Sequence, residues 1–253
     1  MKKLQSRTEE HGAAEGEALF LASYQPGAYA RPAVTVDLVV LTVVDAELRV
    51  LLVRRNEHPS KGAWALPGGF VRVGDGHHAQ GEDLEAAAAR ELEEETGLTT
   101  SDVFLEQLGA FGKAGRDPRM RVITVAYYAL VRPDLVARVR PGGDASDVGW
   151  RDVAHARRSK LAFDHKDILD AALARLRSRI ESTDIAAGLV PATFTIPELR
   201  HVHALVTGTP PDPGNFRRRV QRMLEDHVIE QAPGKRITSS KPALVYRFAR
   251  PRR

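Results

Sequence analysis

The segment from residue 33 to 55 contains two apolar runs rich in β-branched residues, AVTVDLVVLTVV and LRVLLVRR. A short polar stretch at 45–47 separates them, and this pattern predicts a β-hairpin. Another apolar run at 119–131 predicts a further strand. Between these strands we expect a helix over roughly 82–96, because Gly97 is the kind of residue that ends a helix in the left-handed conformation. Strands on both sides of a helix predict an α/β or α+β domain.

In the last third of the chain the pattern changes from strands to helices. The run 163–180 has apolar residues at helical spacing and predicts a connecting helix. Residues 195–208 and 215–230 predict two further helices, and 234–248 predicts a hairpin. Helix, turn, helix and hairpin in this order are typical of a winged helix-turn-helix domain.

We therefore divide the chain into four parts: an N-terminal arm (1–31), an α/β domain (32–160), a connecting helix (161–183) and a winged helix domain (184–253). The arm is polar, rich in Ala and Gly and without sustained period. We expect it to be largely disordered.

The first and last parts of the chain differ in charge. Residues 191–253 contain twelve Lys and Arg against five Asp and Glu, a net charge of +7, although the whole chain carries only +4. The rest is therefore acidic, and the basic part is expected to bind a polyanion. The longest apolar run, at 38–44, is far shorter than the ~20 residues that a membrane helix needs. With no cysteine and no visible secretory signal, we expect a cytoplasmic protein without disulfides, thiolate metal sites or membrane association.

Four glutamates lie within five positions of the segment RELEEETGL at 90–98. Three of them fall on the apolar side of a helical wheel: Glu91, Glu94 and Glu95. Their neighbours point elsewhere and are expected to be solvated: Glu82, Glu85 and Glu93. Carboxylates beside a buried stripe need a compensating charge, and oxygen ligands at this spacing suit Mg²⁺ or Mn²⁺. We predict a metal site rather than a solvated helix face, with Arg90 placed to orient Glu94.

The same region resembles the Nudix box. In GHHAQGEDLEAAAARELEEETGL, Gly76 is followed after five residues by Glu82, and the pattern continues through Arg90-Glu91-Leu92, Glu94-Glu95 and Gly97-Leu98. The resemblance implies a Nudix α/β/α sandwich that binds a nucleoside diphosphate linked to another group. It also implies Mg²⁺ or Mn²⁺ held by Glu91, Glu94 and Glu95, with Glu94 and Glu95 catalytic if the chain is active. We assign nucleotide binding to Arg54, Gly68, Gly69, Phe70 and Arg116.

The loop before this helix departs from the family pattern, since twelve residues separate Gly69 from Glu82. Such a loop helps to set metal and phosphate geometry, and a displacement of about an ångström costs roughly a hundredfold in rate. We therefore expect nucleotide binding with weak or absent hydrolysis. His77 and His78 lie in this loop and are expected to be solvated.

The predicted helix at 215–230 begins with a cluster of arginines, and Asn215 is expected at its N-cap. Cations at a helix N-terminus oppose the helix dipole, so an external polyanion explains the cluster better than helix stability does. In this motif the second helix enters the major groove, and the basic hairpin suits phosphate contact. The predicted DNA contacts are Asn215, Arg217, Arg218, Arg219, Arg222, Arg236 and Lys241.

Together the two domains resemble the Nudix-related transcriptional regulators of NAD metabolism, over roughly residues 31–250. The resemblance rests on LAFDHKDILDAALARL, TFTIPELRHVHALVTG, NFRRRVQRML and PALVYRF. It implies a homodimeric repressor of NAD biosynthesis or salvage genes, released from double-stranded operator DNA by ADP-ribose or a related nucleotide. The alternatives are a Mg²⁺-dependent ADP-ribose pyrophosphatase and, more weakly, a Nudix hydrolase of capped RNA. Stacking aromatics beside basic residues, which the RNA alternative favours, are few after Trp150.

Overall fold

The chain forms two compact units, Met1–Pro32 and Ala33–Arg253. The computed structural model describes residues 16–74, 80–139, 147–181, 184–237 and 242–249. In the first unit, residues 16–23 form a helix and Pro26–Ala28 form a 3-10 turn. The prediction of a largely disordered arm is wrong for these residues, because Glu, Ala and Leu in GEALFLAS favour the helix.

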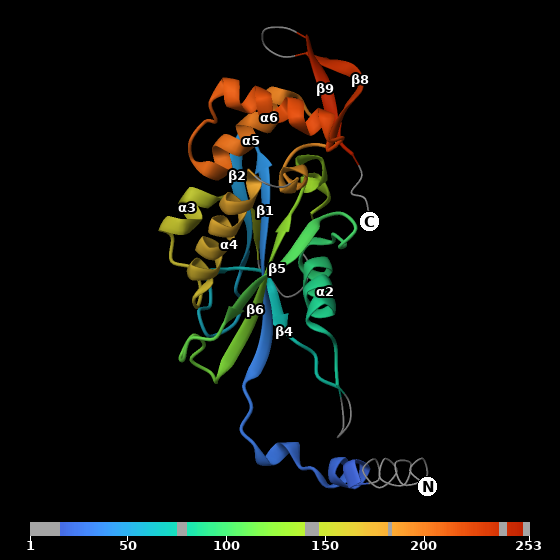
Figure 1. The fold of residues 1–253 in the computed structure, drawn as a ribbon. Coiled ribbons are helices and arrows are strands. Elements are labelled where there is room, and N and C mark those ends of the chain that lie inside the picture. Colours follow the sequence, from blue (N-terminus) through green and yellow to red (C-terminus); the bar gives the residue numbers. More distant parts are fainter. Residues whose placement is uncertain (1–15, 75–79, 140–146, 182–183, 238–241, 250–253) are drawn as a thin grey trace, which may run out of the picture. The chain divides into compact units, whose positions relative to one another are not determined.

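The second unit is built on one seven-stranded mixed sheet (Figure 1). Its strands are β1 (Ala33–Val44), β2 (Glu47–Arg54), β3 (Trp64–Ala65), β4 (Gly68–Phe70), β5 (Phe104–Phe111), β6 (Val122–Leu130) and β7 (Val148–Asp152). The central order is β3-β2-β1-β6-β5, with β4 paired to β1 and β7 paired to β2. β1 and β6 run parallel, whereas the other pairs are antiparallel. β5 was not predicted from the sequence.

The predicted hairpin at 33–54 is confirmed. β1 and β2 pair from Leu41↔Val50 to Val44↔Glu47, which leaves two residues in the turn. These residues, Asp45 and Ala46, have φ angles of 52° and 60°. Positive φ at both central positions defines the type I′ turn, whose twist matches that of the flanking strands.

Helices cover both faces of the sheet (Figure 1). α2 (Leu84–Thr96) packs on one face and α4 (His165–Ile180) on the other, while the short α3 (Val153–Arg158) precedes α4. Alternation along β1 decides which side chain meets which helix, because successive strand residues point to opposite faces. Leu38 packs in the cluster with α2, whereas Leu41 packs in the cluster with α4. This arrangement confirms the predicted α/β/α sandwich.

The C-terminal residues form the predicted winged helix. It contains η3 (Ile185–Gly188), α5 (Ile196–Thr207), α6 (Pro213–Glu225), β8 (Ile229–Ile237) and β9 (Pro242–Phe248), and η2 (Pro133–Arg138) lies earlier, after β6. α5 begins with a capping box between Thr195 and Glu198, and Gly208 ends it at φ 81°. Phe194 and Tyr246 exchange two backbone hydrogen bonds of 2.8 and 2.7 Å, which tie the start of α5 to the wing.

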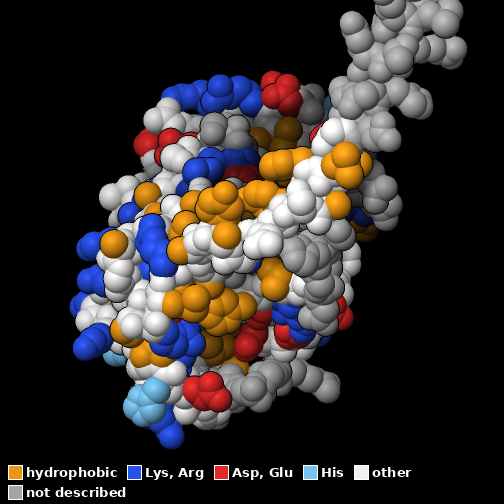
Figure 2. All heavy atoms as spheres, turned by 90° about the horizontal axis from the view of Figure 1, so that it is seen from below, with side chains coloured by type: hydrophobic (Ala, Val, Ile, Leu, Met, Phe, Trp, Pro, Cys, Tyr) orange, Lys and Arg blue, Asp and Glu red, His pale blue; other side chains and the backbone are white. Residues whose placement is uncertain are grey.

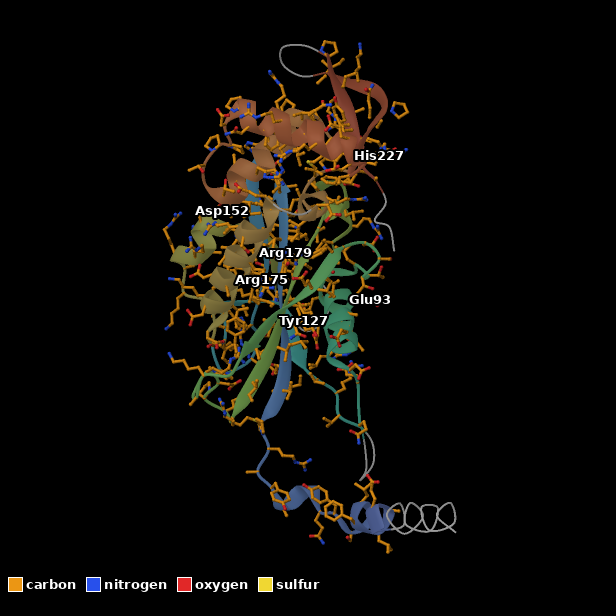
Figure 3. All side chains as sticks on the ribbon, in the orientation of Figure 1. Glu93, Tyr127, Asp152, Arg175, Arg179 and His227 are labelled. Atoms are coloured by element: carbon orange, nitrogen blue, oxygen red, sulfur yellow. The ribbon has the colours of Figure 1, made fainter. Side chains whose placement is uncertain are left out.

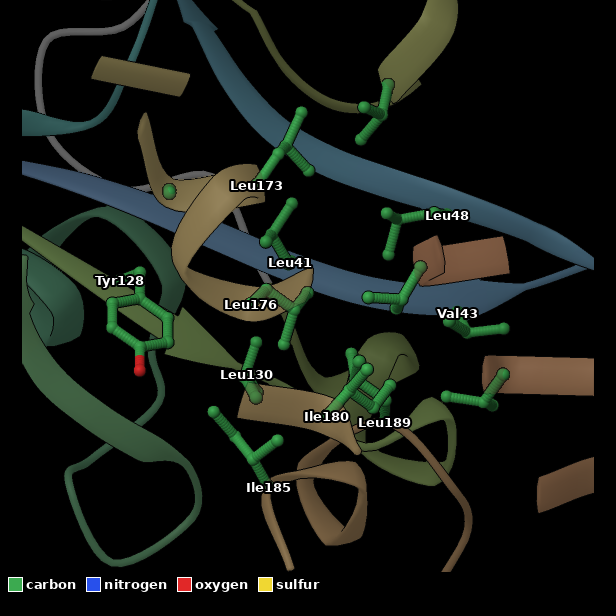
Figure 4. Packing of buried hydrophobic residues seen from close by; sticks show 14 of the residues in the cluster. Leu41, Val43, Leu48, Tyr128, Leu130, Leu173, Leu176, Ile180, Ile185 and Leu189 are labelled. Carbon is green, nitrogen blue, oxygen red and sulfur yellow. The ribbon is translucent and has the colours of Figure 1, made fainter. Parts of the chain in front are cut away.

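One hydrophobic cluster continues from the sheet through α4 into the winged helix. Leu41 and Leu130 of the sheet face Leu173, Leu176 and Ile180 of α4 (Figure 4). The same cluster extends to α6 and β8 through two further buried residues: Phe216 and Ile229. The α/β domain and the winged helix therefore share a core instead of being joined by a flexible linker.

Polar contacts add to this packing on one side of α4. Figure 3 labels Arg175 and Arg179 on this helix. Arg179 forms an ion pair with Glu106 of β5, and its Nη1 lies 3.2 Å from the hydroxyl of Tyr128.

Among the described residues, no helix has the length and apolar character to span a bilayer.

Candidate functional site

The strand β4 passes against the buried end of the glutamate cluster. A Cβ atom added to Gly69 would lie 2.2 Å from Glu91 Oε1, and one added to Gly68 would lie 2.2 Å from the carbonyl of Val36. Gly68 also has a φ of 152°, which side chains disfavour. Both glycines are therefore required by close approach of the chain to β1 and α2.

Arg90 is the centre of the glutamate cluster. Its Nη1 donates to Glu91 Oε1 at 2.6 Å and to Glu94 Oε2 at 2.9 Å, and its Nη2 donates to Glu82 Oε1 at 2.6 Å. Arg72, which the sequence analysis did not identify, donates to Glu94 Oε1 at 2.9 Å. The predicted contact between Arg90 and Glu94 is confirmed, and the cluster is held together by arginine.

Two carboxyl groups bound by Arg90, those of Glu82 and Glu91, differ in their pKa. The Arg90 guanidinium lowers the pKa of the Glu82 carboxyl to about 2. Burial instead raises the pKa of the Glu91 carboxyl, although Arg90 opposes this effect. Glu91 is therefore a desolvated carboxylate that an additional cation would stabilise.

The helical wheel was right about Glu91 and wrong about two of its neighbours. Glu91 is buried, but the Glu94 side chain is 45% exposed and paired with Arg90. Glu82, expected to be solvated, has a side chain only 17% exposed, because it lies just before α2 and folds back onto Arg90. Within the described part of the chain, no three His, Asp or Glu side chains are arranged to hold a metal ion. Arg90 binds two members of the predicted trio, Glu91 and Glu94, and the metal site stays a prediction.

The predicted nucleotide residues lie around β2 and β4. Phe70 is 45% exposed, and the guanidinium of Arg119 stands 5.6 Å from the centre of its ring. Arg54 is exposed at the end of β2 and donates to the carbonyl of Gly62 at 3.2 Å. On the face shown in Figure 2, acidic and basic side chains lie beside a gathering of hydrophobic ones. An exposed ring beside cations suits a nucleotide.

The structure corrects the role assigned to Arg116. Its side chain is 4% exposed, and its Nη2 donates to Asp164 at 2.6 Å and to Asp37 at 3.1 Å. Two carboxylates satisfy a buried guanidinium, which leaves it unsuited to a phosphate. Asp37 faces Gly68 across the β1–β4 pair, so Arg116 supports the segment Gly68–Gly69, the glycine turn, through Asp37.

Two buried residues near Arg116, Asp37 and His165, were not predicted as functional from the sequence. Asp37 interrupts the apolar run of β1, and a charge within an apolar strand was the available signal. His165 begins α4 and accepts a 2.8 Å hydrogen bond from the backbone N–H of Leu66 at its Nδ1. Three predicted positions lie outside the described residues: Gly76, His77 and His78.

The basic helix begins earlier than predicted. Asp212, not Asn215, is the N-cap of α6, and its side chain accepts a hydrogen bond from the backbone N–H of Asn215 at 2.8 Å. Pro213 follows as the first helical residue, because its fixed φ suits that position and its missing N–H is not needed there. Asn215 instead accepts a hydrogen bond from Arg218.

The arginines of α6 fall into two groups. Arg217, Arg218 and Arg222 are exposed, and no described acidic side chain forms an ion pair with them. Arg219 is half-buried, and its Nη2 donates to the carbonyl of Ile180 at 2.6 Å. The exposed group forms a basic surface for a polyanion, whereas Arg219 is turned toward the protein.

Arg236 of the wing also differs from its predicted role. Its Nη1 lies 2.6 Å from Glu198 Oε1, and its Nη2 donates to the carbonyl of Thr193 at 2.8 Å. The carboxylate at the start of α5 thus neutralises the wing arginine, which makes it a poor phosphate contact. Lys241, the other predicted wing contact, lies outside the described residues.

Comparison with known proteins identifies both domains. Residues 33–172 match the model of the NUDIX domain, and residues 186–248 match that of the NrtR DNA-binding winged helix domain. The chain is 37% identical over 92% of its length to an ADPR responsive transcriptional repressor from Acinetobacter baylyi, of which it covers 88%. It is also 36% identical, over 56% of its length, to an ADP-ribose pyrophosphatase from Methanocaldococcus jannaschii, of which it covers 73%.

Solved structures agree with these relatives. Shewanella oneidensis NrtR complexed with a 27mer DNA superposes with a TM-score of 0.73 at 34% identity, covering 85% of this chain and 93% of that one. The NUDIX domain of the same protein complexed with ADP ribose has a TM-score of 0.52 at 35% identity, covering 63% of this chain and 98% of that one. The chain therefore belongs to the NrtR family of Nudix-related transcriptional regulators.

Proposed function

We propose that this protein is a repressor that binds operator DNA through α6 and the wing and releases it when ADP-ribose occupies the Nudix domain. The observation that carries the proposal is the basic face of α6. Its exposed arginines have no acidic partner among the described residues, and a cationic face on a recognition helix is suited to DNA. The regulated genes are those of NAD biosynthesis or salvage, as the family resemblance implies.

We further propose that the protein is a cytoplasmic homodimer. The winged helix motif binds palindromic sites as a dimer, with half-sites about 34–36 Å apart. A nucleotide that changes the spacing of two recognition helices would therefore weaken binding. We divide the chain functionally into a nucleotide-sensing domain (32–160), a connecting helix (161–183) and a DNA-binding domain (184–253).

In the proposed nucleotide site, β4 and Phe70 lie beside the glutamate cluster. Gly68 and Gly69 allow close approach of the backbone, and the exposed Phe70 ring offers a stacking surface. The carboxylates Glu91, Glu94 and Glu95 provide the hard oxygen donors that Mg²⁺ or Mn²⁺ prefers. When bound, such a metal would neutralise phosphate charge and activate water. To hold it, Glu91 and Glu94 would have to exchange Arg90 for the metal.

A mobility shift tests DNA binding and effector together. The DNA would be duplexes from upstream of NAD biosynthesis and salvage genes, with and without ADP-ribose. We expect a discrete complex that ADP-ribose dissolves and AMP does not. Absence of a complex on every duplex would refute the repressor, and a complex insensitive to ADP-ribose would refute the effector.

Calorimetry gives an independent check on the effector. Linkage requires that a tenfold loss of DNA affinity on nucleotide binding equal a tenfold loss of nucleotide affinity on DNA binding, about 1.4 kcal/mol of coupling. Equal nucleotide affinities with and without a saturating duplex would remove ADP-ribose as the effector and leave DNA binding intact.

A second candidate activity is ADP-ribose hydrolysis, which the complete Nudix box favours. We expect turnover below about 1 s⁻¹, the lower end of ordinary enzymes, because the loop before α2 is long and Arg90 binds two of the carboxylates. Steady-state assays with Mg²⁺ and Mn²⁺ measure it. In the double variant Glu94→Gln with Glu95→Gln, calorimetry should show weaker metal binding.

A further inference from the structure

Arg219 occupies an unusual place for a residue in a cluster of DNA-binding arginines. It is half-buried, while its neighbours Arg218 and Arg222 are exposed. Its Nη2 donates to the carbonyl of Ile180, the last residue of α4, at 2.6 Å. The last carbonyls of a helix have no partner within that helix, and a cation there also interacts favourably with the negative end of the helix dipole. Arg219 therefore caps α4 from the recognition helix.

Two other arginines make the same kind of contact between neighbouring elements. Arg177 of α4 donates through Nε to the carbonyl of Val206, in the last turn of α5, at 2.9 Å. Arg200 of α5 donates through Nε and Nη2 to the carbonyl of Pro211, just before α6, at 3.1 and 2.8 Å. With Arg219 these contacts form a closed ring: α4 binds α5, α5 binds the connector to α6, and α6 binds α4. We call these three residues the arginine ring.

The opposite end of α4 is fixed beside the proposed nucleotide site. His165 accepts the backbone N–H of Leu66, two residues before Gly68. Asp164, the N-cap of α4, binds Arg116, which also holds Asp37 opposite Gly68. α4 has sixteen residues and so a length of about 24 Å. A single helix thus binds Leu66, just before the glycine turn, at its start and the recognition helix at its end.

We propose that Arg219 is a positioning residue that locks the recognition helix to α4 and carries the ADP-ribose response to the DNA-binding surface, instead of touching DNA. The proposal rests on the proposed function. A movement of α4 caused at the glycine turn reaches α6 through the contact between Ile180 and Arg219. The exposed arginines of α6 contact DNA, and Arg219 fixes the angle at which they do so.

The test compares Arg219→Ala and Arg219→Lys with Arg217→Ala, a matched loss of one arginine from the exposed face of the same helix. Anisotropy titrations of the full chain on an operator duplex over a series of salt concentrations give the affinity and the salt slope. For Arg219→Ala we expect at least tenfold weaker binding with an unchanged salt slope. For Arg217→Ala, loss of a phosphate contact should reduce the slope by about one unit.

The effector response separates a positioning role from a general loss of structure. In Arg219→Ala, ADP-ribose should bind the free protein with unchanged affinity. The factor by which ADP-ribose weakens DNA binding should nevertheless fall toward one. Arg219→Lys keeps a donor for the Ile180 carbonyl and should restore DNA affinity to within about threefold. A bidentate base contact would not tolerate lysine in this way.

Three results would overturn the inference. These are a salt slope reduced in Arg219→Ala as in Arg217→Ala, an unchanged DNA affinity, or a full ADP-ribose response in the variant. Failure of the proposed function is distinguishable, since the parent chain itself would then neither bind the duplex nor respond to ADP-ribose.

Discussion

The glutamate cluster of α2 and the arginine cluster of α6 are both runs of like charge on a helix, but the fold treats them differently. In α2, Arg90 binds three carboxylates and Arg72 adds a further contact, so the charges are largely neutralised within the protein. In α6, Arg217 and Arg222 form no ion pair with any described residue. The glutamate cluster of α2 is closed, in the sense that its charges are paired within the protein, and it must exchange that partner to bind a ligand. The arginine cluster of α6 is open, because its exposed charges have no such partner among the described residues, and it can bind an external polyanion directly.

The largest effect is expected at the open cluster. Replacing both Arg217 and Arg222 by Ala should weaken operator binding by about 2–6 kcal/mol if each reads a base, at about 1–3 kcal/mol per contact. If both contact phosphates, the salt slope should fall by about two units instead. Salt-dependent anisotropy distinguishes the two cases, and unchanged affinity would show that α6 is not the recognition helix.

Loss of an arginine from the closed cluster should lower the stability of the fold. Arg90→Ala leaves the buried Glu91 without its cation and should lower the free energy of unfolding by about 3 kcal/mol. The control is Arg72→Ala, whose pair with Glu94 is exposed and should contribute about 0–1 kcal/mol. Urea denaturation measures both. Equal losses would mean that burial does not distinguish the two arginines.

A third test concerns the packing beneath the open cluster. His203 of α5 is 2% exposed and faces the ring of Phe216, with centroids 5.2 Å apart. Burial, with help from Arg219, lowers the pKa of His203 to about 4, against an ordinary 6.5. The unfolded chain therefore binds the extra proton first as pH falls.

Stability due to His203 is thus complete above pH 6.5 and lost as the pH falls toward 4, with a difference of about 3 kcal/mol at pH 4. The measurement compares pH-dependent unfolding of the parent with that of His203→Gln, which cannot titrate. Parallel pH profiles for the two proteins would contradict the assignment.

The smallest effect is expected at Arg236. Because its guanidinium is bound to Glu198 and Thr193, Arg236→Ala should cost about 1 kcal/mol of stability and leave the salt slope of DNA binding unchanged. A slope reduced by about one unit would show that the wing arginine leaves Glu198 for a phosphate. Arg247→Ala, which breaks the exposed pair with Glu230, serves as the control for loss of a wing charge.

Local patterns in the sequence determined the parts of this protein that depend on neighbouring residues. The hairpin at 33–54, the helix ends at Gly97 and Gly208, the burial of Glu91 and the order of elements in the winged helix all follow from periodicity and turn chemistry. These features are set within a few residues along the chain, so the sequence carries them directly.

Only the tertiary structure decided which charged side chains are paired within the protein and which are exposed without a partner among the described residues. Glu82 and Glu94 share Arg90, Arg116 is held between Asp37 and Asp164, Arg219 caps α4, and Arg236 binds Glu198. A helical wheel gives the direction of a side chain, but a long flexible arginine bends toward whichever carboxylate or carbonyl the fold brings within reach. Most of those partners lie far away in sequence, and only packing of the sheet, α4 and the winged helix brings them together.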